Sequence, residues 1–293
     1  MRLRIPLRLL VWSSPMLPCL FFGLFGLLLG SFLNVCIVRL PAGESVVWPR
    51  SHCRQCNEAI ASWDNVPVLS WLLLGGACRK CGGRISWRYP LVELATCILF
   101  LICCLYFSYG WLAACWALLC FLLLGLAVMD AETLLLPDWF TLPGLAAGIV
   151  FAALRPGLES GIWTWSASVH SARLSLLAAA VAAAVLLLIA GAYWLFRRRM
   201  GMGLGDVKLL AMLAAWLGLQ ETGLVLFLAV IVGALYGVGT ILFRRRTGSR
   251  NRNDDQLPAG QMPIPFGTML CLAGIYSIFL GQRTLGWYMQ FFH

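Results

Sequence analysis

Long apolar stretches alternate with short polar segments along almost the whole chain. A stretch of roughly eighteen or more apolar residues is long enough to cross the hydrocarbon core of a bilayer as a helix. The pattern predicts about eight such helices, over roughly 15–36, 91–108, 111–128, 139–154, 174–196, 209–218, 223–243 and 266–281. A polar break between Gly218 and Gly223 interrupts the apolar stretch that holds the sixth and seventh. We therefore predict an all-α, polytopic membrane protein.

The composition agrees with this prediction. Of the 293 residues, 61% are hydrophobic and only 12% are charged, whereas soluble domains carry about 25% charged residues. Arg2, Arg4 and Arg8 precede the first apolar stretch, as they would in a cleavable signal peptide. That stretch is too long for a signal peptide and has no convincing small-residue cleavage site. Residues 1–36 are therefore expected to hold a first transmembrane helix that is retained.

Lysine and arginine are unevenly distributed between the segments that separate the helices. With the N-terminus outside, the segments 37–90, 129–138, 197–208 and 244–265 lie inside and hold 16 of the 22 Lys and Arg residues. This bias predicts that they face the cytoplasm, although three arginines before the first helix argue locally against it. Two arginine triplets directly follow apolar helices, which indicates anchoring to anionic membrane lipid and no nucleic-acid partner. The net charge of +10 follows largely from this topology.

Four of the twelve cysteines form a pattern in the first polar loop, 37–90. They are arranged as two Cys-x-x-Cys pairs, Cys53 with Cys56 and Cys78 with Cys81. Two such pairs are typical of a structural zinc site, in which four thiolates surround one ion and leave no open position. A disulfide or redox role is the alternative, and the expected cytoplasmic location argues against it. No internal repeat is evident, and the other eight cysteines lie in or beside apolar helices, where they are expected to pack as small apolar residues.

Two aspartates stand where apolar helices begin or end. Asp130 closes one apolar run, and Asp206 follows Gly203 and Gly205 directly before another. A carboxylate beside the apolar layer is costly, and the predicted topology places both on the same face. Two carboxylates that share one site titrate as a unit, so one serves as base and the other as acid. The alternatives are that Asp206 is the N-cap of its helix and that Asp130 is a solvated helix end.

Several stretches resemble the type IV prepilin leader peptidases. Residues 203–206 match the GxGD signature of aspartyl proteases that act in membranes, and Asp130 precedes Pro137 and Asp138 as in the first catalytic segment of that family. Further resemblance lies in 30–35 with 39–41, in 64–72, in 85–93 and in 264–267, so that it covers about residues 25–280. Arg54 departs from the family, which often has proline inside the first cysteine pair, and so does the polar insertion near 247–256.

The resemblance implies an activity and a set of site residues. Family members remove a basic leader from type IV prepilins and type II secretion pseudopilins after a glycine, at the bacterial inner membrane. Many then methylate the new N-terminus with S-adenosylmethionine. Carried over by position, the catalytic residues are Asp130 and Asp206, the metal ligands are the four loop cysteines, and the supporting residues are Gly203, Gly205, Lys208, Glu132, Pro137 and Asp138. The implied division is a first helix in 1–36, a cytoplasmic four-cysteine domain in 37–90 and a peptidase domain in 91–293.

Some alternatives remain open at this point. The chain has no Gly-rich dinucleotide fingerprint, so a site for S-adenosylmethionine is expected in the cysteine loop or its flanks, where Asp64, Asn65 and Glu93 are polar candidates that could equally be structural. Glu132 and Asp138 are candidates for receiving the basic leader. The other functions considered are a peptidase without methylation, a GxGD protease with other substrates, an ion-coupled transporter, and a zinc-stapled docking module.

Overall fold

The apolar stretches form helices, because a helix satisfies every backbone polar group within its own segment in lipid. The computed structural model describes residues 16–108, 110–198, 203–247 and 265–292. In chain order the elements are α1 (Met16–Arg39), η1 (Ser62–Asn65), α2 (Leu69–Leu73), α3 (Arg88–Tyr106), α4 (Trp111–Thr133), α5 (Asp138–Ser160), α6 (Trp165–Arg197), α7 (Leu204–Leu217), α8 (Leu219–Thr247), α9 (Phe266–Tyr276), η2 (Ser277–Gly281), α10 (Gln282–Met289) and η3 (Gln290–Phe292). Within these ranges the only β-structure is two isolated bridges in the cysteine loop.

Six of these helices are long and apolar enough to span a membrane: α1, α3, α4, α5, α6 and α8. The all-α polytopic fold is therefore confirmed. The number of eight crossings remains a prediction, because α7 has only 14 residues and α9 only 11. A polar break was expected over 218–223. In the structure only Gly218 lies between α7 and α8, and its φ of 83° ends α7.

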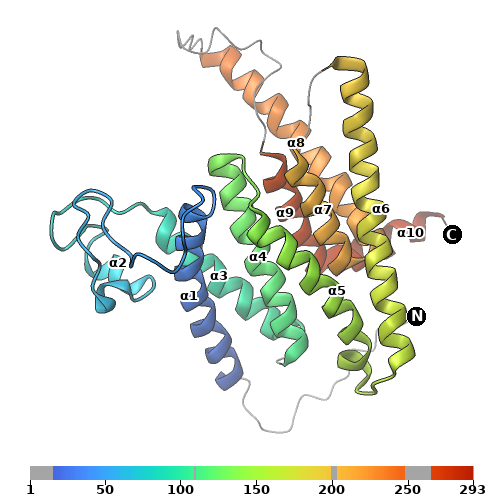
Figure 1. Cartoon of the computed structure of the whole chain (residues 1–293), viewed down its shortest axis with the longest axis horizontal. Helices are drawn as coiled ribbons and strands as arrows, with labels where there is room; N and C mark the ends of the chain where they lie inside the picture. Colours follow the sequence, from blue (N-terminus) through green and yellow to red (C-terminus); the bar gives the residue numbers. More distant parts are fainter. Residues whose placement is uncertain (1–15, 109, 199–202, 248–264, 293) are drawn as a thin grey trace.

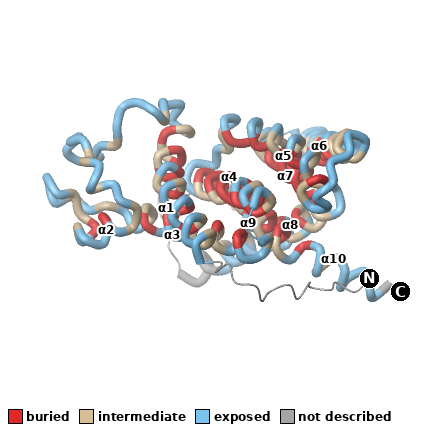
Figure 2. The backbone as a smooth tube through the Cα atoms, turned by 90° about the horizontal axis from the view of Figure 1, so that it is seen from below, coloured by how far each residue is buried: buried red, intermediate tan, exposed pale blue. Residues whose placement is uncertain are grey.

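The helices pack side by side in a bundle (Figure 1). Helix α1 lies along α3, α3 packs on α4, and α4 packs on α5 and α9. Helix α7 lies among α5, α6, α8 and α9, and every residue from Val207 to Leu217 except Lys208 is buried. Buried positions accordingly gather on α4 and α7 (Figure 2). Because α7 is apolar all round, it suits a position inside the bundle.

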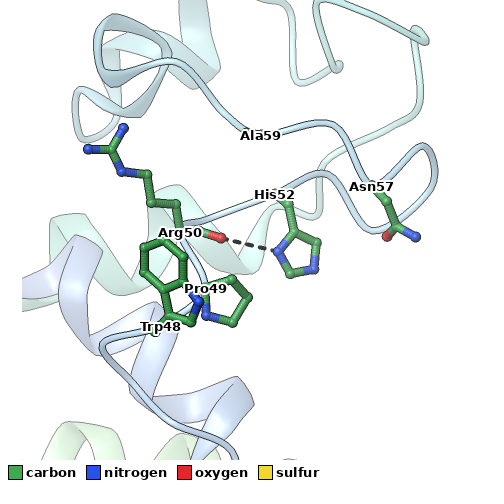
Figure 3. Close-up of a pocket in the computed structure, with 6 residues that line it drawn as sticks. All are labelled: Trp48, Pro49, Arg50, His52, Asn57 and Ala59. Atoms are coloured by element: carbon green, nitrogen blue, oxygen red, sulfur yellow. Dashed lines mark hydrogen bonds between the residues drawn. The ribbon is translucent and has the colours of Figure 1, made fainter.

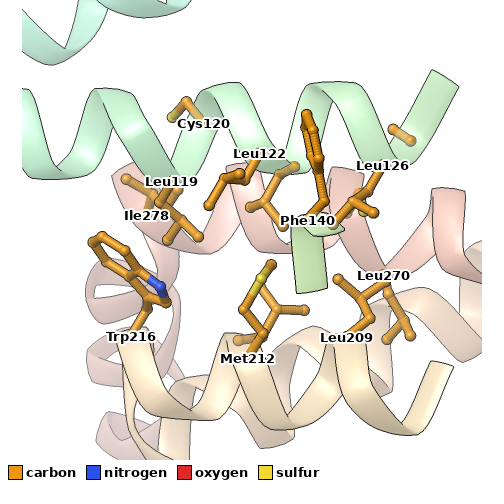
Figure 4. Packing of buried hydrophobic residues seen from close by; sticks show 14 of the residues in the cluster. Leu119, Cys120, Leu122, Leu126, Phe140, Leu209, Met212, Trp216, Leu270 and Ile278 are labelled. Atoms are coloured by element: carbon orange, nitrogen blue, oxygen red, sulfur yellow. The ribbon is translucent and has the colours of Figure 1, made fainter. Parts of the chain in front are cut away.

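The core forms where α4, α5, α7 and α9 meet. Leu119, Leu122 and Leu126 of α4 face Leu209, Met212 and Trp216 of α7, with Phe140, Leu270 and Ile278 filling the space between (Figure 4). The indole N–H of Trp216 donates to the carbonyl of Gly144 at 2.8 Å, which satisfies the one polar group of that side chain. This packing fixes the ends of α4 and α7 relative to each other.

Helices α1 and α3 cross at very short range. A Cβ added at Gly30 would lie 2.7 Å from the Cα of Glu93, so only glycine fits there. One turn further on, the side-chain amide of Asn34 donates to the carbonyl of Tyr89 at 3.0 Å. These contacts explain why the Gly30–Asn34 stretch stands out in the sequence: it is the face of α1 that meets α3.

The four-cysteine domain, which runs between α1 and α3, lies to one side of the bundle (Figure 1). It is fastened to the start of α3, where buried Glu93 accepts a hydrogen bond from the N–H of Val68 at 2.7 Å. The rings of Trp71 and Trp87 lie 4.4 Å apart and reinforce the junction. The domain therefore meets the bundle at the end where α1 finishes and α3 begins.

Candidate functional site

Asp130 lies in the last turn of α4 and is buried, with only 4% of its surface exposed. The helix ends immediately afterwards, because Leu134 adopts a left-handed conformation (φ 56°) and its N–H donates to the carbonyl of Asp130 at 2.9 Å. The alternative of a solvated helix end is therefore wrong for Asp130. A buried carboxylate requires partners of its own.

Those partners come from the first turn of α9. The backbone N–H and the hydroxyl of Thr268 approach the same oxygen of Asp130, Oδ2, at 2.6 and 3.0 Å. The first N–H groups of a helix have no partner within it and carry partial positive charge, so they suit a carboxylate. A Cβ at Gly267 would lie 3.0 Å from the Cγ of Asp130, so glycine permits this approach. Sequence analysis missed Thr268, although it follows directly on the stretch 264–267 that was singled out.

Asp206 lies in the first turn of α7 and is half-buried. The N-cap of the helix is Gly203, so the alternative of Asp206 as N-cap is wrong. Burial, followed by the nearby charge of Asp130, raises the pKa of Asp206 to about 6, against a lowering by a backbone hydrogen bond with Gly203. The two carboxylates predicted to form a pair are thus close enough to influence each other, and they come from α4 and α7 at the same end of the bundle.

The supporting residues predicted from sequence surround this pair. Gly205 packs against Leu136, and a Cβ at Gly205 would lie 3.0 Å from the Cβ of that leucine. Pro137 is the N-cap of α5. Lys208 of α7 pairs with Asp138 of α5 at 2.6 Å between Nζ and Oδ1.

Glu132, at the end of α4, has a partner that sequence analysis did not foresee. It accepts a hydrogen bond from Nη1 of Arg88, 44 residues earlier in the chain. Both carboxylates expected to receive a basic leader, Glu132 and Asp138, are therefore already paired with cations of the protein itself.

The four loop cysteines form a compact cluster. Their sulfur atoms all lie within 4.8 Å of one another, and the Sγ atoms of Cys53 and Cys81 are 3.8 Å apart. A tetrahedral zinc ion with Zn–S bonds of about 2.3 Å requires sulfurs about 3.8 Å apart. All four are free thiols, and 3.8 Å is far beyond a disulfide bond. The donor set and its spacing therefore fit a four-thiolate metal site.

The two Cys-x-x-Cys turns are built in the same way. The N–H of Cys53 donates to the carbonyl of Glu58, and the N–H of Cys78 donates to the carbonyl of Gly83. In each turn the fourth residue after the first cysteine is left-handed, Asn57 in one and Gly82 in the other. One isolated antiparallel bridge closes each turn at equivalent positions. The structure thus shows a short repeat where none was evident in the sequence.

The polar residues considered for S-adenosylmethionine have mostly structural contacts. Asp64 receives a two-pronged hydrogen bond from Arg79, with distances of 2.6 to 3.1 Å, and this guanidinium holds the pKa of that carboxyl below its usual range. Glu93 binds the backbone of Val68. Asn65 is exposed in the η1 turn.

An open pocket of about 520 Å³ lies in the four-cysteine domain (Figure 3). Its lining includes the ring of Trp48 and the imidazole of His52, whose Nδ1 lies 3.2 Å from the carbonyl oxygen of Arg50. The volume is in the range of small-molecule sites. None of the described residues that line it carries a carboxylate to pair with the positive sulfonium and ammonium groups of S-adenosylmethionine. The lining therefore does not fit that cofactor.

Comparison with known proteins divides the chain into two matched segments. Residues 24–107 match the bacterial peptidase A24 N-terminal domain, and residues 116–238 match the type IV leader peptidase family. Proteins named prepilin leader peptidase/N-methyltransferase are similar over nearly their whole length. The one from Aeromonas salmonicida (strain A449) is 36% identical, with 94% of this chain and 96% of the relative covered. The one from Aeromonas hydrophila is 37% identical with the same coverage, and the one from Pseudomonas aeruginosa is 35% identical, with 95% and 96% covered. No solved structure matches the chain.

Proposed function

The chain belongs to the type IV leader peptidase family, and from that premise we propose that it is a membrane-embedded aspartyl endopeptidase that removes the leader from prepilins or pseudopilins. The observation that carries the proposal is that Asp130 from α4 and Asp206 from α7 lie at one end of the bundle, where Leu136 packs both on Gly205, next to Asp206, and on Gly267, which contacts Asp130. By analogy with the named relatives, the same enzyme methylates the new N-terminus with S-adenosylmethionine.

The two carboxylates share one proton in the proposed mechanism. Two donors from Thr268 hold the negative charge on Oδ2 of Asp130, so Asp130 is the base. The raised pKa of Asp206 makes it the group that keeps the proton. Asp130 takes a proton from water as the water oxygen attacks the scissile carbonyl, and Asp206 gives its proton to the carbonyl oxygen. The tetrahedral intermediate then breaks its C–N bond as the proton on Asp130 passes to the leaving amine. One hydroxyl proton of the intermediate returns to Asp206, which leaves a carboxylic acid product and restores the single proton of the dyad.

The substrate is proposed to enter from the membrane. A prepilin presents a basic leader followed by an apolar helix, which would lie in the bilayer beside the enzyme with its junction at the cytoplasmic face. Of the 22 Lys and Arg residues, 16 lie in the four segments that the sequence predicts to be inside, and Asp130 and Asp206 belong to two of these segments, which supports a cytoplasmic site. Anionic inner-membrane lipid at that face would attract the same leader.

The metal at the four cysteines is proposed to be zinc with a structural role. Cys53, Cys56, Cys78 and Cys81 would supply all four ligands, so the ion would fold the domain and take no part in peptide hydrolysis. Elemental analysis of the full-length protein, purified without chelator, should find about one zinc per chain. Finding no metal together with four titratable loop thiols would refute the assignment.

Purified enzyme incubated with a prepilin tests the peptidase by product mass. Asp130→Asn and Asp206→Asn should each abolish leader removal while the protein stays inserted in the membrane. Asp138→Asn, which removes a carboxylate paired with Lys208 nearby, should have a milder effect and is the matched control. Near wild-type processing by both dyad variants would contradict the aspartyl mechanism. Adding S-adenosylmethionine tests methylation separately: a product that gains no methyl group identifies a peptidase alone.

A further inference from the structure

Arg88 connects the two parts of the chain next to the dyad. It is the first residue of α3, and its Nη1 lies 2.5 Å from Oε2 of Glu132, two residues after Asp130. Arg88 belongs to the matched segment 24–107 and Glu132 to the matched segment 116–238. The ion pair therefore joins the N-terminal domain to the helix end that carries a catalytic carboxylate.

The surroundings of Arg88 differ from those of a solvated surface cation. Its side chain is 19% exposed, and its guanidinium carbon lies 4.9 Å from the centre of the Tyr89 ring. Its Nε and Nη2 atoms are buried and have no hydrogen-bond partner among the residues that the structure describes. A guanidinium with buried nitrogens interacts more strongly with its counterion than an exposed one does, because water screens the charge less. Glu132 is thus the anion that compensates this charge.

The backbone that carries Arg88 is itself fixed. The carbonyl of the next residue, Tyr89, accepts the amide of Asn34 from α1, and one turn later Glu93 binds the N–H of Val68 from the four-cysteine domain. On the other side of the ion pair, α4 ends at Thr133, one residue after Glu132. Terminal turns of helices fray unless a contact holds them. Arg88 therefore gives this helix end a second fixed contact, beside the one between Asp130 and Thr268.

We propose that Arg88 is a positioning residue for Asp130, which it holds in place through Glu132. The proposal rests on the proposed function, because it assumes that Asp130 is catalytic. A misplacement of about 1 Å at a catalytic group can cost roughly a hundredfold in rate. Since Arg88 already neutralises Glu132, the pair orders the end of α4 and does not serve as a docking site for the basic leader.

Reversal of the two charges tests the proposal. Full-length enzyme in detergent is compared as wild type, Arg88→Glu, Glu132→Arg and the double reversal, with kcat and KM measured for leader removal from a prepilin. Each single reversal places two like charges together and should lower kcat about tenfold, equivalent to about 1.4 kcal/mol in the barrier, with KM within about twofold. The double reversal restores an attractive pair and should return kcat to within about threefold of wild type. Glu159→Gln breaks the exposed Arg155–Glu159 pair at the other end of the bundle and should leave kcat unchanged.

Three outcomes would overturn the proposal. The first is an unchanged kcat in Arg88→Glu, and the second is a double-reversal enzyme that is equally folded but no more active than the single variants. The third is a defect confined to KM for basic leaders, which would make Glu132 a docking residue. If Arg88→Glu does not fold, Arg88→Gln, which removes only the charge, must show the same loss of kcat. Leader removal by the Asp206→Asn enzyme in the same assay would instead refute the dyad, so the two failures are distinguishable.

Discussion

Thr268 places two donors on one carboxylate oxygen, and its hydroxyl can be removed with almost no change of shape. The hydroxyl proton is shared between Oδ2 of Asp130 and the carbonyl of Ala127, both at 3.0 Å. A hydrogen bond to a charged group contributes about 1.5–3 kcal/mol. If about 1.4 kcal/mol of that is lost, Thr268→Val should lower kcat about tenfold while the backbone N–H remains in place.

Thr222→Val is the matched control for this prediction. Thr222 is equally β-branched, is 2% exposed, and bonds a backbone carbonyl, that of Gly218, at the other end of α7. Its replacement should leave kcat within about twofold of wild type. Equal losses in the two variants would show that Thr268 acts only through general packing.

The proposed role of Asp206 as the acid predicts a pH dependence. Because its pKa is raised to about 6, the carboxyl is protonated below that pH and loses its proton as pH rises. Hydrolysis requires one proton on the dyad, so kcat/KM, which reports on the free enzyme, should fall as pH rises through about 6. The measurement is kcat/KM for leader removal from about pH 5 to 8. A flat profile over this range would contradict the assignment of Asp206 as the acid.

At the level of the helix pair, Gly30 sets how closely α1 approaches α3. A Cβ at this position meets backbone, the Cα of Glu93 at 2.7 Å, which cannot move aside as a flexible side chain can. Gly30→Ala should therefore destabilise the protein by about 1–3 kcal/mol, the usual cost of overpacking, and lower its apparent Tm in detergent. Gly191→Ala, in α6 with nothing within 4 Å of the added atom, should be neutral or stabilising by up to about 1 kcal/mol. If both variants melt at the same temperature, the close crossing is not a determinant of stability.

The sequence predicts where the helices lie in the chain better than it predicts which helices pack against one another. Hydropathy identifies a stretch that avoids water, but lipid and protein interior are equally apolar, so α7 at the centre of the bundle looks like the lipid-facing helices around it. The aspartates were predictable because placing a carboxylate beside an apolar run costs free energy whether lipid or protein surrounds that run. The role of Arg88 was not predictable, because it depends on Glu132 in another helix. Nothing in the local pattern of polar and apolar residues distinguishes Arg88 from a cation in a loop.

The same reasoning applies to the cysteine turns. The Cys-x-x-Cys spacing alone predicted four ligands for one ion, since that spacing is what a tight turn requires. The likeness of the two turns lies in backbone hydrogen bonds and left-handed residues, which Asn57 and Gly82 adopt with different side chains. Sequence comparison sees the side chains and so missed a repeat that the backbone makes evident.

For the molecule as a whole, one contact constrains the topology. Thr268 at the start of α9 touches Asp130 at the end of α4, so α9 must begin at the dyad end. Helix α7 also begins there, with Asp206. If α8 crossed the membrane and α7 did not, α9 would begin on the side opposite to Asp130. The contact therefore requires α7 to cross the membrane away from the dyad side and α8 to cross back. This arrangement agrees with the eight predicted crossings, which remain a prediction because α7 is only about 21 Å long at 1.5 Å per residue.

Reporter fusions test this topology. A reporter that is active only outside the cytoplasm should be active when it is fused after residue 162, in the connection between α5 and α6. It should also be active when it is fused after Gly218. A reporter fluorescent only in the cytoplasm should be bright after residue 247, at the end of α8. A cytoplasmic position for Gly218 would contradict the α7–α8 pair, and reversal at all three positions would place the dyad outside.

The contact between Thr268 and Asp130 also has a consequence for how the enzyme is made. A ribosome synthesises the chain from its N-terminus, so Asp130 and Asp206 both enter the membrane before the helix that completes their surroundings. Thr268 follows Asp130 by 138 residues, and until it arrives Asp130 lacks the two donors that hold its charge. Under the proposed mechanism, a partly synthesised chain carries both aspartates without a working site, and we expect leader removal to begin only when α9 takes its place in the bundle.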